Sequence, residues 1–410
     1  MKRAMLGSAL TLALGASVLA ISAGNSASAT QPAASAALTT NWYASAPYLM
    51  PLGNNPPDPT TVMAATGQKA FQLAFILAGG GCSAAWDGTD PVSSDTQVGA
   101  VINQIRAAGG DVSVSVGGYN GTKLGQICSD AAATAAAYQA VVSRYGLKAI
   151  DFDLEEPEYE NSAAIANELG AAQILQRNNP GIFISVTMPG TSAGTGWFGT
   201  QLIDEAKSLG FTPNDYSIMP FDGGFSGGSS QVSALEGLHG LLMSHLGWDA
   251  ATAYAHEGFS GMNGRSDSSE MFYQSDFQTV LDYATSHGLG RFTFWSVNRD
   301  RPCTTTTDNG VCSNVTQNDW DFTKFTTEFA GATPPQSPPP TGSGGSGGGS
   351  GGGSGGGSGS CTVAAWSATT AYNGGAVVSY GSHTWTAKWW TYGDVPGNNA
   401  QAVWVDDGAC

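Results

Sequence analysis

Between residues 40 and 330 the sequence alternates short apolar runs with longer segments of helical periodicity. The apolar runs have the length of buried strands, and the segments between them are long enough to connect parallel strands. Eight strands are expected, at 47–50, 70–77, 111–116, 148–154, 182–188, 216–221, 251–255 and 291–296. This pattern predicts an α/β fold, a (β/α)8 barrel whose functional site lies at the carboxyl ends of the strands.

Helical patterns fall between most of these strands, at 95–108, 131–145, 161–178, 200–209, 232–246 and 274–287. In the first of them Asp95 is the expected N-cap, and Gly109-Gly110 ends the helix. The alternative architecture is an open, doubly wound sheet. No GxGxxG motif follows the first strand, and eight units are many for that fold, so the barrel is favoured.

A change of composition marks a boundary at 331–360, which is rich in Pro and then contains Gly and Ser alone after Thr341. Such a segment predicts a linker. We therefore expect a catalytic domain at 40–330 and a small domain at 361–410. The small domain is rich in aromatic residues, more than a core of about fifty residues can hold, so several are expected to be exposed.

The N-terminus has the pattern of a secretory signal peptide at 1–29. Lys2 and Arg3 precede an apolar stretch, and Ala27-Ser28-Ala29 offers a cleavage site. The alternative, a membrane anchor, is disfavoured because Gly and Ser interrupt the short apolar stretch. We expect a secreted, extracellular protein without a membrane partner.

Six cysteines suit an oxidising compartment and allow fifteen pairings in principle. Cys361 and Cys410 bracket the small domain, and Cys303 and Cys312 are close in sequence. These considerations predict the pairs Cys82–Cys128, Cys303–Cys312 and Cys361–Cys410. None of the cysteines has zinc-type spacing, and the five histidines are scattered, so no metal or cofactor is expected.

Acidic residues outnumber basic ones by 32 to 15, and the net charge is −17. This balance argues against a nucleic-acid partner, which would require a basic surface.

Three acids alternate with apolar residues along the expected strand at 148–154. Side chains on a strand point alternately to its two faces. Asp151, Asp153 and Glu155 should therefore line the barrel interior, with Glu155 nearest the rim, while Ile150 and Phe152 face the helices. Closely spaced acids cannot all ionise at low cost, so at least one should hold a proton near neutral pH. A protonated Glu155 could donate to a leaving-group oxygen.

This row resembles the DxDxE signature of family 18 glycoside hydrolases, and Ser115-Val116-Gly117-Gly118 matches the SxGG element of that family. The usual leading Asp-Gly pair is replaced by Lys148 and Ala149, as in a subgroup of bacterial and archaeal chitinases. The segment 294–300 is also typical of that subgroup.

The resemblance implies a retaining, substrate-assisted mechanism. Glu155 would protonate the glycosidic oxygen, Asp153 would orient the attacking N-acetyl group of the substrate, and Asp151 would share charge with Asp153. The alternative, Asp153 as a direct nucleophile, suits two acids on one strand face poorly.

Other family positions are expected to bind substrate. Met219-Pro220-Phe221-Asp222 resembles the MxYD element, with Phe221 in place of the usual Tyr, and Asp222 would contact the acetamido group. Trp295 would form the floor under the reacting sugar. Ser115 and Gly117 complete the expected substrate-binding set. Arg299 and Asp300 could bind sugar or form a structural ion pair, and Glu156, Glu158 and Glu160 are expected to be solvated.

The small domain resembles a family 5/12 chitin-binding module, which implies a small all-β unit closed by a disulfide. The matching residues are Ala365-Trp366, Tyr372, Gly375, Val378, Trp385, 387–391, Pro396-Gly397 and Val403-Trp404. Trp389 and Trp390, with Tyr372, are expected on the chitin-binding face. Trp366, Trp385 and Trp404 could equally be core residues.

The resemblance as a whole implies a secreted, monomeric chitinase that acts on chitin and N-acetylglucosamine oligomers. Two alternatives remain, an endo-β-N-acetylglucosaminidase that acts on glycans and a non-catalytic chitin-binding lectin.

Overall fold

The structure is a computed structural model that describes residues 38–304, 306–332 and parts of the C-terminal segment. In that segment it describes 363–367, 371–372, 376–388, 391–392, 395–397 and 403–409. The expected signal peptide and most of the expected linker, together with Trp389, Trp390, Cys361 and Cys410, lie outside the described residues.

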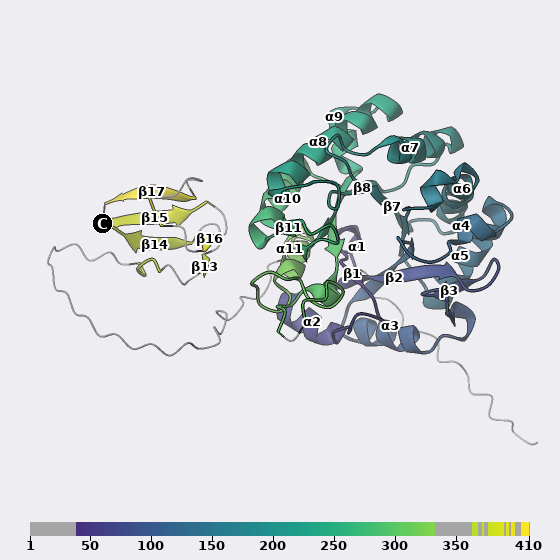
Figure 1. The fold of residues 1–410 in the computed structure, drawn as a ribbon, viewed down its shortest axis with the longest axis horizontal. Coiled ribbons are helices and arrows are strands. Elements are labelled where there is room, and N and C mark those ends of the chain that lie inside the picture. Colours follow the sequence, from purple (N-terminus) through teal and green to yellow (C-terminus); the bar gives the residue numbers. More distant parts are fainter. Residues whose placement is uncertain are drawn as a thin grey trace, which may run out of the picture. The chain divides into compact units, whose positions relative to one another are not determined.

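Within the described residues, eight parallel strands form the predicted barrel (Figure 1). They are β1 (Tyr48–Leu49), β2 (Ala70–Ala78), β5 (Asp111–Gly117), β6 (Ala149–Asp153), β7 (Phe183–Pro189), β8 (Asp215–Met219), β9 (Glu257–Met262) and β12 (Arg291–Trp295). Each pairs in parallel with the next in this order. Side-chain bonds connect the last strand to the first: Thr293 donates to the Ala46 carbonyl at 2.6 Å, and Asn298 pairs with the Met50 backbone.

Helices surround the barrel (Figure 1). The longer ones are α2 (Pro59–Thr66), α3 (Gln97–Ala107), α5 (Ala131–Tyr145), α6 (Ser162–Asn178), α7 (Trp197–Leu209), α8 (Gly227–Leu246), α10 (Gln274–His287) and α11 (Asp321–Phe329). The prediction that Asp95 is the N-cap of α3 is wrong by one residue, because Thr96 holds that position and the helix begins at Gln97. The Asp95 carboxylate nevertheless accepts from the amides of Val98 and Gly99 in the first turn. Among the described residues, no helix is long and apolar enough to cross a membrane.

Shorter elements complete the large domain. They are α1 (Thr40–Ala44), α4 (Leu124–Ile127) and α9 (Ala250–Ala255), the strands β3 (Ala84–Trp86), β4 (Asp90–Pro91), β10 (Gly264–Arg265) and β11 (Met271–Phe272), and the 3₁₀ turns η1 (Val92–Ser94), η2 (Glu158–Glu160) and η3 (Val297–Arg299). Strands β3 and β4 extend the sheet beside β2, and β10 pairs with β11 as a separate hairpin.

The prediction of a strand at 251–255 is wrong. That segment belongs to helix α9, because Asp249 caps the Thr252 amide and the Ala residues favour a helix. The barrel strand is β9, which begins only at Glu257. Two glycines interrupt its apolar pattern. A Cβ at Gly258 would lie 2.0 Å from the Ser217 hydroxyl, so the close packing of β9 against β8 requires glycine there.

The two faces of β6 separate as predicted. Ile150 and Phe152 are buried in the hydrophobic core, and Phe152 packs edge-on against Tyr138 of α5. Asp151 and Asp153 are buried on the opposite, inward face. Disulfides join Cys82 to Cys128 and Cys303 to Cys312, as predicted, and the third expected pair lies outside the described residues.

The C-terminal unit is all-β in its described residues. Strands β14 (Val377–Tyr380), β15 (His383–Ala387) and β17 (Trp404–Ala409) form an antiparallel sheet, and β13 (Ala371–Tyr372) pairs with β16 (Thr391–Tyr392). Val378, Ala387, Val403 and Trp404 form its buried core.

Candidate active site

The pairing of three neighbouring strands places the acidic row at the centre of the barrel. Asp151 on β6 lies in register with Ser115 on β5 and Ser185 on β7. Asp153 lies in register with Gly117 and Thr187. The acids therefore face a ring of small and hydroxyl-bearing residues, which leaves room for carboxylates and supplies donors to them.

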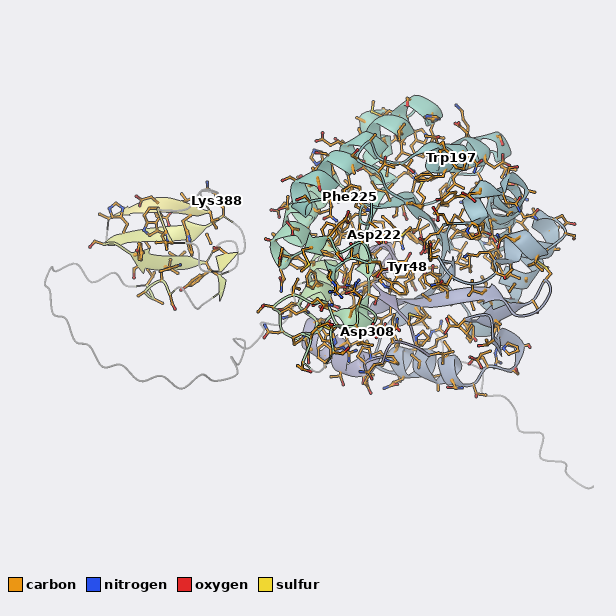
Figure 2. All side chains as sticks on the ribbon, in the orientation of Figure 1. Tyr48, Trp197, Asp222, Phe225, Asp308 and Lys388 are labelled. Carbon is orange, nitrogen blue, oxygen red and sulfur yellow. A yellow bond between two sulfur atoms is a disulfide. The ribbon has the colours of Figure 1, made fainter. Side chains whose placement is uncertain are left out.

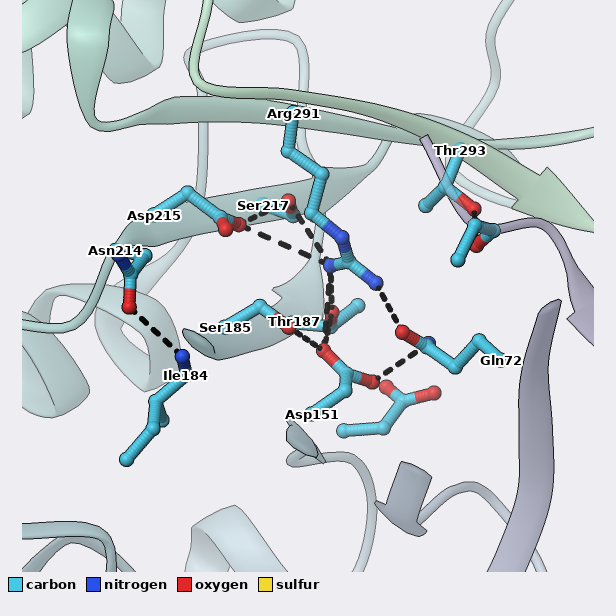
Figure 3. A network of polar contacts seen from close by, with 12 residues as sticks. Gln72, Asp151, Ile184, Ser185, Thr187, Asn214, Asp215, Ser217, Arg291 and Thr293 are labelled. Atoms are coloured by element: carbon cyan, nitrogen blue, oxygen red, sulfur yellow. Dashed lines mark hydrogen bonds and ion pairs between the residues drawn. The ribbon is translucent and has the colours of Figure 1, made fainter. Parts of the chain in front are cut away.

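Asp151 accepts more hydrogen bonds than the other two acids of the row, and Figure 3 shows part of the network around it. Its Oδ1 accepts from the hydroxyls of Ser185 and Thr187, at 2.6 and 2.8 Å. Its Oδ2 accepts from Ser115 at 2.7 Å and from Tyr48 and Gln72, each at 3.0 Å. Five donors thus satisfy the oxygens of this buried carboxyl group and fix its orientation.

Arg291, the first residue of β12, supplies the positive charge of this network. Its Nη1 lies 3.2 Å from Asp151 Oδ1 and 3.8 Å from Asp215 Oδ1, and its Nη2 donates to Gln72 at 2.9 Å. Burial raises the pKa of Asp215 to about 7 even though Arg291 opposes this shift. Arg291, Tyr48 and Gln72 belong to none of the sequence motifs. The feature that could have indicated them is a polar residue in each of three apolar strand segments.

Asp153 has a different environment. Its Oδ2 lies 3.1 Å from the Tyr48 hydroxyl, and its Oδ1 has no hydrogen-bond partner among the described residues. Burial and the neighbouring charges of Glu155 and Asp151 hold the pKa of Asp153 well above its usual range. Of the three acids, Asp153 is thus the one whose ionisation is opposed by burial and by two neighbouring carboxyl groups together.

The two glycines of the SxGG element allow β5 to approach this acid closely. Gly117 has a φ of 100°, and a Cβ there would lie 2.1 Å from the backbone oxygen of Asp153. Gly118 also has a positive φ, and its amide donates to the same oxygen at 2.8 Å. Ser115 and Gly117 thus support Asp151 and Asp153 from the neighbouring strand.

Glu155 lies at the rim, two residues beyond Asp153, the last residue of β6, and is half-buried. Burial raises its pKa to about 7, the buried cation of Lys123 opposes this, and Glu156, Asp222 and Asp267 add to the rise. Lys123 is held in place because its Nζ donates to the carbonyls of Tyr119, Asn120 and Gly121. Glu155 can therefore either hold or release a proton near neutral pH.

Trp295 ends β12 and belongs to an aromatic group beside the acids. Its ring stacks on Phe75 with 5.5 Å between centroids and a 12° interplanar angle, and Tyr48 meets it edge-on at 5.6 Å. Trp295 is only partly buried. The same tyrosine therefore contacts the aromatic group through its ring and the two aspartates through its hydroxyl.

The residues that resemble the MxYD element follow β8. Met219 is buried and Phe221 is half-buried against the main core. Asp222 is exposed, has a φ of 57°, and accepts a hydrogen bond from the Ser268 amide at 2.6 Å (Figure 2). Asp222 is thus held by a loop that the sequence analysis did not connect with the site.

The expectation that Glu158 is solvated is wrong. Glu158 and Glu168 are both fully buried, because α6 and the turn η2 fold over them. Glu168 accepts from the Gly125 amide at 2.6 Å and from Tyr138 at 2.9 Å. Burial raises the pKa of Glu168 to about 7 and that of Glu158 well above its usual range, with each carboxyl group affecting the other.

Arg299 and Asp300 are also buried, and each has structural partners. Asp300 accepts from the amides of Phe322 and Thr323 at the start of α11 and from Gln317. Arg299 donates to the Arg265 carbonyl. Two exposed aromatic residues that the sequence motifs do not include, Tyr119 and Trp197, lie in segments that follow β5 and β7. Trp197 is labelled in Figure 2.

In the C-terminal unit, Tyr372 is half-buried. Its ring meets Trp404 edge-on at 5.3 Å, and its hydroxyl accepts from the Ser367 amide at 2.6 Å. Trp366 and Trp385 pack against the same core. Among all described residues, no three His, Cys, Asp or Glu side chains are grouped so that they could hold a metal ion.

The three acids thus differ in their surroundings with depth. Asp151 pairs with Arg291, burial and neighbouring charges hold the pKa of Asp153 well above its usual range, and burial raises the pKa of Glu155 to about 7. A rim carboxyl group with this property can act as a general acid and then as a general base.

Comparisons with known proteins agree with this geometry. Residues 365–405 match the model of carbohydrate-binding module family 5/12. The chain is 28% identical over 277 residues to a probable bifunctional chitinase/lysozyme of Escherichia coli (strain K12), covering 63% of this chain and 31% of that protein. It is 28% identical over 282 residues to endochitinase 11 of Metarhizium anisopliae, covering 64% of this chain and 53% of that protein.

The chain thus spans about a third and about half of the length of these two relatives. Among solved structures, the catalytic domain of a hyperthermophilic chitinase from Pyrococcus furiosus is similar, with a TM-score of 0.61 and 25% identity. That match covers 69% of this chain and 93% of the domain. These similarities confirm the resemblance predicted from the sequence, both for the barrel and for the C-terminal unit.

Proposed function

We propose that this protein is a chitinase that hydrolyses the β-1,4 bonds between N-acetylglucosamine units of chitin. The observation that carries the proposal is the inward-facing row of acids on β6, with Asp151 and Asp153 buried in the barrel and Glu155 two residues beyond the strand, where burial raises its pKa to about 7. Glycoside hydrolysis requires a carboxylic acid that remains protonated near neutral pH. The similarity to three chitinases supports the choice of substrate.

In the proposed mechanism Glu155 protonates the glycosidic oxygen, and the N-acetyl oxygen of the substrate attacks the anomeric carbon. The Oδ1 atom of Asp153, which has no partner among the described residues, is available to the acetamido N–H. Water then opens the intermediate with retention, and Glu155 takes a proton from that water. Trp295 supports the reacting sugar, and Asp222 contacts the acetamido group.

The C-terminal unit has the proposed role of keeping the enzyme on solid chitin. The match of residues 365–405 to a carbohydrate-binding module supports this role, and Trp389 and Trp390 are the proposed contact residues. We also propose that residues 1–29 direct export and that the protein acts outside the cell. The disulfides at Cys82–Cys128 and Cys303–Cys312 suit that environment.

The test is product analysis by mass spectrometry after incubation with chitin and with N-acetylglucosamine hexamer. The wild type should release short N-acetylglucosamine oligomers, and Glu155→Gln should slow release by about 10²–10⁴-fold, the contribution of a general acid. Glu160→Gln, at an exposed acid of the same segment, is the matched control and should keep full activity.

Each alternative has its own outcome in this test. Tight binding to chitin without release of any product would favour a lectin. Release from N-linked glycans but not from chitin would favour an endo-β-N-acetylglucosaminidase. A loss below tenfold in Glu155→Gln would contradict the assignment of the acid.

A further inference from the structure

A carboxylate outside the acidic row binds the loop that carries Asp222. Glu270 precedes β11, at the end of the connection from β10, and is half-buried. Its Oε2 accepts from the Asp222 amide at 2.6 Å, and its Oε1 accepts from the amides of Gly224 and Phe225 at 2.6 and 2.7 Å. Three short, charge-assisted bonds to one loop are a strong anchor.

The contact is reciprocal. Asp222 Oδ1 accepts from the amide of Ser268, which lies in the same connection as Glu270. That connection is closed on itself, because Ser266 donates its amide to the Glu270 carbonyl at 2.8 Å and accepts the Glu270 amide on its hydroxyl at 3.2 Å. Each loop therefore holds an acidic residue of the other through backbone amides.

The backbone of Asp222 needs such support. Its φ of 57° lies in the left-handed region, which costs free energy for a residue with a side chain unless the surroundings enforce it. One further bond holds the segment just before Asp222, because Gln231 of α8 donates to the Pro220 carbonyl at 3.0 Å. Glu270 is the partner that binds the amide of Asp222 itself.

We infer that Glu270 is a positioning residue for the proposed reaction: it fixes the loop after β8 so that the Asp222 carboxylate stays at the mouth of the barrel with Glu155. The inference rests on the proposed function and extends it to a residue with no place in the sequence motifs. The charged groups around Glu155 and Asp222 are of two kinds. The acids are Asp222, Asp267 and Glu156, and the buried cations of Lys123 and Arg299 oppose them.

This arrangement makes a specific prediction about pH. The charge of Asp222 contributes to the raised pKa of Glu155. If Glu270 keeps Asp222 in place, Glu270→Ala should let that charge move away and lower the pKa of Glu155. The alkaline limb of the profile of kcat/KM should then shift to lower pH, as it should in Asp222→Asn.

The experiment compares wild type, Glu270→Ala, Asp222→Asn and the double variant on N-acetylglucosamine hexamer across pH. Each single variant should lose at least about tenfold in kcat/KM, since small misplacements near a reacting group can cost about 10²-fold. The double variant should lie within about twofold of Asp222→Asn, because coupled residues are not additive. Independent, multiplying losses, or an unmoved alkaline limb, would overturn the inference.

Two further variants test whether the loss of activity in Glu270→Ala is a purely structural effect. Glu270→Gln keeps an oxygen that can accept from the loop amides, so it should retain more activity than Glu270→Ala. Glu236→Ala, at an exposed acid on α8, should behave as wild type. Amide hydrogen exchange should rise at 221–226 in Glu270→Ala but not in β6, and an unchanged rate at 221–226 would also overturn the inference.

Failure of the inference and failure of the proposed function look different. If the wild type releases oligomers and only the coupling is missing, Glu270 does not position Asp222. If the wild type releases nothing from chitin or hexamer, the proposed function falls and the inference falls with it.

Discussion

Arg291 at the start of the last barrel strand pairs with Asp151 in the middle of the fourth, with 3.2 Å between Nη1 and Oδ1 and no exposed side-chain surface on either residue. An arginine does not lose its proton in a protein, so its charge is permanent. The pair places one permanent positive charge inside the barrel, beside Asp151 and 3.8 Å from Asp215 Oδ1. The surroundings of the acidic row are thus set in part by a residue on another strand.

Removal of that cation should be costly. Arg291→Met leaves the buried Asp151 carboxylate without its charge partner, and breaking a buried pair in this way costs about 3–5 kcal/mol. Urea denaturation should show this loss in the free energy of unfolding, while Arg177→Met, at an exposed arginine on α6, should change it little. A loss below about 1 kcal/mol for Arg291→Met would contradict the role assigned to the pair.

Gly117 and Gly181 form a matched pair for testing the SxGG element. Both have a positive φ, but a Cβ at Gly181 meets nothing within 4 Å, whereas at Gly117 it would lie 2.1 Å from the Asp153 backbone. Gly181→Ala should cost about 1–2 kcal/mol for the left-handed backbone alone. Gly117→Ala should cost about 1–3 kcal/mol more because of overpacking and should also reduce turnover. Equal losses in thermal unfolding would show that the close approach is unimportant.

Lys123 should control the pH range of the proposed reaction. Its buried cation lowers the pKa of Glu155, so Lys123→Gln should raise that pKa above about 7. The acid form would then persist to higher pH, and the alkaline limb of kcat/KM should move upward, opposite to the shift expected for Asp222→Asn. Lys148→Gln, at an exposed lysine before β6, is the control. A folded Lys123→Gln protein with an unmoved or lowered limb would contradict this assignment.

Stability should fall as pH rises because of the buried pair Glu158 and Glu168. The folded-state pKa of Glu168 is about 7, above its ordinary value of 4.5, so its stabilising contribution is complete below about pH 4.5 and is lost as pH rises through 7. At 1.36 kcal/mol per unit, the contribution is on the order of 3 kcal/mol.

Glu168→Gln mimics the protonated form and should flatten the dependence of unfolding free energy on pH between 5 and 8. Glu160→Gln, at an exposed residue, should leave the slope of the wild type. An unchanged slope in Glu168→Gln would mean that other groups dominate, with Glu257 the first to examine because burial raises its pKa to about 9.

The C-terminal unit offers a test that separates binding from catalysis. Trp389→Ala should weaken binding to insoluble chitin in a pull-down assay and leave the hydrolysis of soluble hexamer almost unchanged. Tyr273→Ala, at an exposed aromatic residue of the large domain, should leave the pull-down unaltered. Equal losses on both substrates in Trp389→Ala would mean that the unit forms part of the active site.

The features that could be predicted from the sequence are those set by local periodicity. Helix α5 occupies the predicted residues 131–145, because Asp130 caps it and Gly146 ends it in the left-handed conformation. The alternation of acids and apolar residues on β6 likewise predicts which side chains face inward. Strand β9 escaped prediction because its two glycines serve contacts with other elements, and such contacts leave no local pattern.

The candidate active site likewise combines features that are set by local sequence with features that are set by distant residues. Its acids could be found from one short motif, whereas their protonation depends on residues brought from other strands and loops. Arg291 lies far from Asp151 in sequence, and Glu270 lies 48 residues from the amide it binds at Asp222. Glu158 could not be distinguished from its solvated neighbours, because only the packing of α6 shows that it is buried.

The position of Arg291 also has a consequence for the nascent chain on the ribosome. The strands that carry Asp151 and Asp215 both emerge before the residue that pairs with their carboxyl groups. Until β12 emerges, a partial barrel would have to bury those carboxyl groups without a cation, which is unfavourable. Chains that end before residue 291 should therefore fail to form a stable barrel, and the barrel should close only after β12 has left the ribosome.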